Sequence, residues 1–93
     1  MRAEIFISNT EGGNFEISVV KEGLSSGAAR KYETVEQVRA VLIKLGLDPT
    51  LIDRQLQLLS TAPSSQLLNF PVAEVADDVL RSSGFTAAAF QAA

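Results

Sequence analysis

The side chains that most often carry out catalysis or bind transition metals are missing from this sequence. Its 93 residues include no histidine and no cysteine. The chain therefore has no imidazole base, no thiolate nucleophile, no disulfide framework and no zinc site of the Cys or His type. An enzyme on this chain would have to use carboxylates, serine or lysine, which is the least favoured of our hypotheses. We expect no enzymatic activity and no cofactor.

The densest group of carboxylates consists of Glu74, Asp77 and Asp78. Glu74 and Asp78 are four residues apart, so a helix would place them on one face, where they could bind Mg²⁺ or Ca²⁺ or dock a partner. Hard cations need more oxygen ligands than these three residues supply. A solvated helix face is the simpler interpretation, and we predict no metal site.

Basic side chains gather around a glycine- and serine-rich stretch at residues 23–27. Lys21, Arg30 and Lys31 flank this stretch, and Tyr32 could stack on a nucleic-acid base. The stretch matches neither GxxxxGK[ST] nor GxGxxG, so a connection between two strands is the simpler interpretation. The four side chains support an alternative hypothesis, a small nucleic-acid-binding or regulatory domain that uses its sheet.

The charge of the chain argues against a nucleic-acid partner. Eleven acidic residues outnumber eight basic ones, and the formal net charge is -3. Nucleic-acid-binding domains usually carry a basic excess. The acidic excess lies in residues 47–93, because residues 1–46 carry equal numbers of acidic and basic side chains. We therefore do not expect nucleic acid among the partners.

Apolar residues give the leading hypothesis. In the second of the helices predicted below, Leu51 and Leu58 form a stripe beside the one that faces the core. Exposed contiguous apolar surface usually marks an interface. The candidate interface residues are the apolar side chains that the predicted core does not need: Leu51, Leu58, Leu67, Leu68 and Phe90. The competing interpretation is that this helix lies between the sheet and the third helix, which would bury both stripes.

These residues predict a non-catalytic protein-interaction module that self-associates, with a second copy of the chain or another protein as its partner. Symmetric dimers are the commonest assemblies of small chains. No apolar stretch approaches the ~18 residues of a membrane helix, so we expect no membrane partner. The apolar run at the N-terminus is too short for a signal peptide, and we expect a cytoplasmic protein.

The first third of the sequence has the pattern of a small antiparallel sheet. Residues 3–8 and 15–20 are rich in β-branched and aromatic types, and a glycine- and asparagine-rich turn joins them as in a hairpin. Residues 28–33 predict a third strand, in which Arg30 and Tyr32 share one face and Lys31 lies on the other. Residues 1–33 thus predict a two- or three-stranded β meander.

Two helices with clear start and stop signals follow the strands. Thr34 and Gln37 are spaced as a capping box, and Gly46 follows the apolar stripe as a left-handed stop. Asp48 then predicts the N-cap of a second helix, with Pro49 at its first position and an end near residue 60. These signals predict a tight corner between the two helices.

A third helix is predicted from Pro71 or Val72 to Ser83. Its apolar residues recur at helical spacing, and Gly84 follows as a second glycine stop: Val72, Val75, Ala76, Val79 and Leu80. Residues 63–70 predict a connection that lies over the core, and residues 86–93 form an alanine-rich tail. The whole chain predicts a single α+β domain, with the meander at residues 1–33 and three helices packed on one face at residues 34–85.

Overall fold

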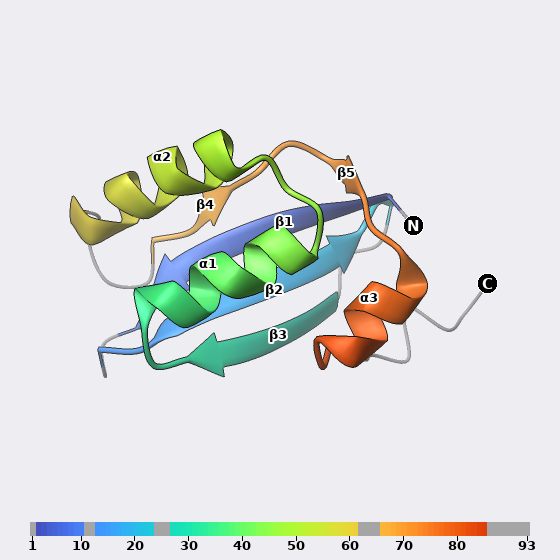
Figure 1. Ribbon diagram of the computed structural model, residues 1–93, viewed down its shortest axis with the longest axis horizontal. Helices are drawn as coiled ribbons and strands as arrows, with labels where there is room; N and C mark the ends of the chain where they lie inside the picture. The colour runs from blue at the N-terminus through green and yellow to red at the C-terminus, as the bar shows by residue number, and fades with distance from the viewer. Residues whose placement is uncertain (1, 11–12, 24–26, 62–65, 86–93) are drawn as a thin grey trace.

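The protein is an antiparallel sheet with three helices, as the α+β prediction requires (Figure 1). The structure is a computed structural model, and it describes residues 2–10, 13–23, 27–61 and 66–85. The strands and helices follow one another as β1 (Arg2–Asn9), β2 (Phe15–Lys21), β3 (Gly27–Tyr32), α1 (Val35–Lys44), α2 (Pro49–Thr61), β4 (Leu68–Asn69), β5 (Ala73–Glu74) and α3 (Asp77–Ser82). The predicted meander is therefore confirmed with all three of its strands.

The sheet is built around β1, which lies between β2 on one side and the two short strands on the other. Its order is β3-β2-β1-β4, and β5 also pairs with β1; every pairing is antiparallel. The hairpin between β1 and β2 closes where the amide of Thr10 donates to the carbonyl of Asn14 at 2.8 Å. Gly13 has φ +82° in this turn, a conformation that glycine adopts at no steric cost.

Alternation along the strands divides the sheet into a core face and an outer face. Ile5 pairs with Val19, and Ile7 pairs with Ile17; all four side chains are buried. The residues between them, such as Phe6 and Ser18, point to the opposite face and are only partly buried. All three helices contribute side chains to the core on the first face, so the sheet is covered from one side.

The capping signals of α1 are confirmed. Thr34 accepts a hydrogen bond from the backbone amide of Gln37, and the side chain of Gln37 accepts one from the backbone of Thr34. At the other end Gly46 has φ +95°, and its amide donates to Ile43 while that of Leu47 donates to Leu42. These two bonds define a Schellman motif, which ends the helix and turns the chain.

The corner between α1 and α2 forms as the sequence predicts. A carboxylate oxygen of Asp48 accepts a hydrogen bond from the amide of Thr50 at 3.0 Å, which caps α2. Leu47 is buried beside this cap, and Ile52 is fully buried one turn later. The corner brings α2 over β1, and the helix then continues through Thr61.

The predicted third helix is wrong at its start. It begins at Asp77 rather than at Pro71 or Val72, and residues 73–74 form β5. Extended chain is favoured here because β1 lies inside the sheet and needs backbone partners on its second side. Phe70 supplies one such bond, from its amide to the carbonyl of Ile5 at 2.8 Å. The glycine stop is confirmed, because Gly84 has φ +86° and the amide of the next residue donates to Leu80.

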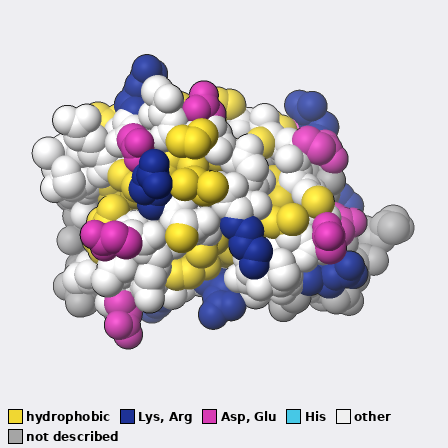
Figure 2. All heavy atoms as spheres, in the orientation of Figure 1, with side chains coloured by type: hydrophobic (Ala, Val, Ile, Leu, Met, Phe, Trp, Pro, Cys, Tyr) yellow, Lys and Arg dark blue, Asp and Glu magenta, His cyan; other side chains and the backbone are white. Residues whose placement is uncertain are grey.

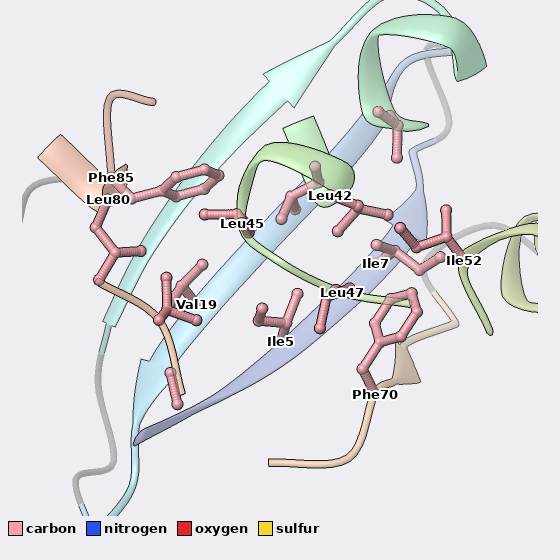
Figure 3. Close-up of a cluster of buried hydrophobic side chains, with 14 of the residues drawn as sticks. Ile5, Ile7, Val19, Leu42, Leu45, Leu47, Ile52, Phe70, Leu80 and Phe85 are labelled. Carbon is pink, nitrogen blue, oxygen red and sulfur yellow. The ribbon is translucent and has the colours of Figure 1, made fainter. Parts of the chain in front are cut away.

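The core is continuous from one end of the sheet to the other (Figure 3). Leu80 and Phe85 lie near Val19 and Leu45, while Ile52 and Phe70 lie near Ile7. Each of these side chains is at most 2% exposed. Residues on either side of the connections that lie outside the described ranges therefore belong to one core.

Candidate interaction surface

The four described leucines among the predicted interface residues border the contact between α2 and β4. The side chain of Gln55 donates to the backbone carbonyl of Asn69 at 2.6 Å, so this flank of α2 faces β4. Leu51 and Leu58 lie four residues before and three residues after Gln55, on the same flank of the helix. Leu67 and Leu68 precede Asn69 in the chain. We call these four residues, Leu51, Leu58, Leu67 and Leu68, the leucine seam.

The leucine seam combines two side chains that pack on the core with two that do not. Leu51 and Leu68 are partly buried against the core. Leu58 is 49% exposed and Leu67 is 59% exposed, the two highest values among the exposed large apolar side chains of the described residues. The seam is therefore an extension of the core that reaches the surface. Phe90, the fifth candidate, lies outside the described residues.

Helix α2 is not placed between the sheet and α3. Its second flank faces α1, where Arg39 donates to Asp53 at 2.8 Å and forms an ion pair. Helix α3 lies at the other end of the molecule (Figure 1). The arrangement that would have buried both leucine stripes is therefore absent from the described part of the chain.

Three more large apolar side chains reach the surface, and the sequence analysis missed them. Val35 and Ile43 on α1 are 38% and 40% exposed, and Val72 between β4 and β5 is 36% exposed. Figure 2 shows that apolar side chains emerge in several places on the helix-covered face, edged by charged side chains. The exposure of Ile43 could have been predicted from the sequence, because this large apolar residue is adjacent to the apolar stripe of its helix and is not part of it.

Strand pairing separates the four residues that were candidates for nucleic-acid binding. Arg30 pairs with the buried Ile17, so Arg30 and Tyr32 lie on the core face of the sheet. Lys31 lies on the outer face, as the strand alternation predicts. Lys21 is at the far end of β2, paired with Ala3. These side chains do not form a single basic surface.

Arg30 has a structural partner at the end of α3. Its Nη1 donates to the backbone carbonyl of Ser83 at 3.4 Å. The guanidinium also lies so close to Gly84 that a Cβ at this glycine would collide with it. A cation near the C-terminus of a helix is favourable because the last carbonyls carry partial negative charge. Arg30 thus connects β3 to the end of α3.

Tyr32 is held at the sheet in a partly buried position. Its hydroxyl is buried, and it has no hydrogen-bond partner among the described residues. Burial raises the pKa of Tyr32, and the nearby charge of Arg30 lowers it by a smaller amount. The ring packs against the core, so part of its surface is not accessible to a nucleic-acid base.

The acidic residues do not share one helix face. Glu74 belongs to β5, while Asp77 and Asp78 are in the first turn of α3, where negative charge is favourable. Within the described ranges, no group of three or more Asp or Glu side chains could hold a metal ion.

Two serine motifs of known nucleophiles occur in the sequence by spacing alone. Ser18 and Lys21 fit S-x-x-K, but residues three apart in β2 point to opposite faces of the sheet. Residues 23–27 fit G-x-S-x-G, which in hydrolases joins a strand to a helix. Here the motif joins β2 to another strand, β3. Ser18 and Lys21 therefore do not face one another, and residues 24–26 of the second motif lie outside the described part of the chain.

Comparisons with other proteins give no indication of the function of this chain. No protein-family model, no curated protein and no solved structure matches this chain. Among the helices that the structure describes, none is both long and apolar enough to span a bilayer.

Proposed function

We propose that this protein is a non-catalytic protein-interaction module that forms a homodimer through the leucine seam. The observation that supports the proposal is the exposure of Leu58 and Leu67 beside the α2–β4 contact. Both lie next to side chains that already pack on the core, so a second copy would extend an existing apolar layer.

The expected dimer is weak. Complete burial of a leucine is worth roughly 1.5–3 kcal/mol, so the half-exposed Leu58 and Leu67 each offer about 1 kcal/mol. A symmetric dimer counts each of them twice, which gives about 4 kcal/mol before the cost of association. A micromolar dissociation constant requires about 8 kcal/mol. About 4 kcal/mol corresponds to a dissociation constant near 1 mM even before that cost, so we expect the leucine seam alone to give dimers only near or above millimolar concentration.

Sedimentation equilibrium at concentrations that extend to the millimolar range tests this proposal. The wild-type chain is expected to shift from monomer to dimer, and the Leu58→Glu and Leu67→Glu variants are expected to stay monomeric. Ile43→Glu is the matched control, because Ile43 is 40% exposed on a different helix. Circular dichroism of each variant checks that the fold is retained.

Two results would contradict the proposal. One is a wild-type chain that remains monomeric at the highest concentration. The other is a dimer that Ile43→Glu disrupts while both seam variants leave it intact, which would place the interface on α1.

A further inference from the structure

Phe6 is an aromatic residue that the core does not use. The other aromatic residues that the structure describes are buried in the core or pack against it: Phe15, Tyr32, Phe70 and Phe85. Phe6 instead pairs with Ser18 on β2 and with Asn69 on β4, and it lies on the outer face of the sheet. None of the described helices covers this face, and the ring of Phe6 is only partly buried there. Apolar surface that folding leaves outside the core often marks an interface.

Two more apolar side chains continue from Phe6 across the outer face. Val20 is two residues from Ser18 along β2, and Leu67 is two residues from Asn69, immediately before β4. Residues two apart in an extended chain share a face, so Val20 and Leu67 are diagonal neighbours of Phe6, about 7–8 Å away and within reach of an aromatic side chain. The residue after Leu67 packs on the core, whereas Leu67 is 59% exposed, as this alternation requires. We call Phe6, Val20 and Leu67 the outer stripe.

Small side chains on β3 leave the outer stripe open to a flat partner surface. Ser18 pairs with Ala29, and Val20 pairs with Gly27, so no large side chain of β3 stands beside these positions. The charged side chain nearest to the stripe is that of Glu4, which lies opposite Val20 on β1. A partner that covers the stripe therefore meets mainly apolar and small side chains, with one carboxylate at the border.

The leucine seam by itself is too small for a stable dimer. Specific protein interfaces bury about 800 Å² per partner, and about 20–30 residues on each side contribute to them. The leucine seam has four residues, two of which already pack on the core. Leu67 belongs both to the leucine seam and to the outer stripe, so the two surfaces are continuous. A second copy that binds at the seam therefore gains further apolar contact by extending over the outer stripe.

We propose that the homodimer interface extends from the leucine seam across Leu67 onto the outer face of the sheet, where a second copy of the chain covers Phe6 and Val20. This inference rests on the proposed homodimer and enlarges its interface. Burial of Phe6 and Val20 in both copies should lower the dissociation constant about tenfold relative to the leucine seam alone. The outer stripe also accounts for an aromatic residue on a face of the sheet that no described helix covers.

Sedimentation equilibrium of matched variants, at concentrations up to the millimolar range, tests this proposal. Phe6→Thr keeps a residue that favours β-strands and should raise the dissociation constant about tenfold. Val20→Thr removes less apolar surface and should raise it about two- to threefold. Glu4→Gln should lower it about twofold, because a dimer brings two carboxylates to the interface. Ile43→Thr is the control on α1 and should leave it unchanged, and circular dichroism checks the fold of each variant.

Amide NMR shifts of the isotope-labelled wild-type chain give a second measurement that needs no substitution. On dilution from millimolar concentration, the amides of Phe6, Ser18 and Val20 are expected to shift together with those of the leucine seam. The amide of Ile43 is expected to stay in place. If Phe6→Thr does not fold, this dilution series still tests whether the second copy reaches the outer face.

The possible results separate this inference from the proposed function on which it rests. A dimer that Leu58→Glu disrupts and Phe6→Thr leaves unchanged would overturn the outer-face interface and leave the leucine seam intact. A dimer that Phe6→Thr weakens and Leu58→Glu does not would support the outer face and contradict the seam. A chain that stays monomeric at millimolar concentration would overturn both. Shifts at Phe6 that Phe90→Ser causes in the monomer would show that the C-terminal tail covers the outer face instead of a second copy.

Discussion

Tyr32 reports on its own surroundings because it is the only tyrosine in a chain without tryptophan. Burial raises its pKa, since the phenolate is disfavoured away from water. We expect its absorbance titration in the folded protein to have a midpoint above that of the urea-unfolded chain. This raised pKa also makes the stability of the fold depend on pH. The free energy that Tyr32 contributes through the shift is constant below its unfolded-state pKa and is lost as pH rises through its folded-state pKa.

The opposing effect of Arg30 on Tyr32 supplies the control for this titration. The positive charge of Arg30 lowers the pKa of Tyr32, so Arg30→Ala should move the midpoint to still higher pH. Arg54→Ala on α2 should not move it, because Arg54 does not contribute to this shift. A midpoint that is the same in folded and unfolded protein would show that the ring is solvated.

Two glycines with the same backbone conformation differ in their neighbours, and this difference is testable. Gly46 and Gly84 both end helices with φ near +90°, where a Cβ costs about 1 kcal/mol. Nothing lies within 4 Å of a Cβ at Gly46, whereas one at Gly84 would collide with Arg30. Urea unfolding should therefore show that Gly84→Ala costs more than Gly46→Ala, by roughly 0.5–1 kcal/mol for the lost contact between Arg30 and Ser83.

A double-mutant cycle isolates the part of this difference that belongs to Arg30. In an Arg30→Ala background, the two glycine substitutions are expected to cost the same. A difference that persists without the arginine side chain would mean that another group restricts Gly84.

At the scale of the elements, the best-predicted features were those with local causes. The capping box of α1, the carboxylate cap of α2 and both glycine stops involve residues at most five positions apart, and all four form as expected. The hairpin is similarly local, because a turn and two alternating strands specify it. Features of this kind can be recognised in a single sequence.

The features that were not predicted depend on contacts between distant parts of the chain. Val72, Val75 and Val79 have the spacing of a helix, but Val72 is exposed and residues 73–74 pair with β1 instead. What decides this segment is the second side of β1, some 70 residues earlier in the chain. A strand of two residues has no periodicity from which to identify it.

The same limit applies to the candidate surface. The sequence identifies Leu51 and Leu58 equally, because both lie on one stripe of α2. Only the tertiary structure shows that Leu51 packs on the core and Leu58 does not. The sequence pattern indicates which apolar residues exceed the number that the core needs. Tertiary packing decides which of these residues remain exposed to solvent.

The first helix offers a direct test of the capping argument. Thr34→Ala removes the hydroxyl that accepts from the amide of Gln37 and should lower the free energy of unfolding by about 1 kcal/mol. Thr50→Ala is the matched control, because Thr50 is exposed in the first turn of α2, where Asp48 supplies the cap. Urea unfolding of both variants gives the comparison, and equal losses would mean that the capping box adds no stability.

At the scale of the whole molecule, residues that come late in the sequence complete the hydrophobic core. Phe70, Val75, Leu80 and Phe85 are all buried against strands from the first quarter of the chain. The hairpin and the first two helices therefore lack part of their core without the last described segment. This arrangement predicts one cooperative unfolding transition, as expected of a small single domain.

Phe70 is the residue at which this closure is best tested, because it is 1% exposed and its amide bonds to Ile5 in the central strand. Phe70→Ala should cost about 3–5 kcal/mol, the range for an aromatic side chain removed from a packed core. Leu67→Ala, three residues earlier and 59% exposed, should cost far less. In urea unfolding followed both by circular dichroism and by tyrosine fluorescence, the two signals should change together. If residues 1–61 formed a core of their own, Phe70→Ala would instead separate the transition into two steps, with Tyr32 reporting only the second.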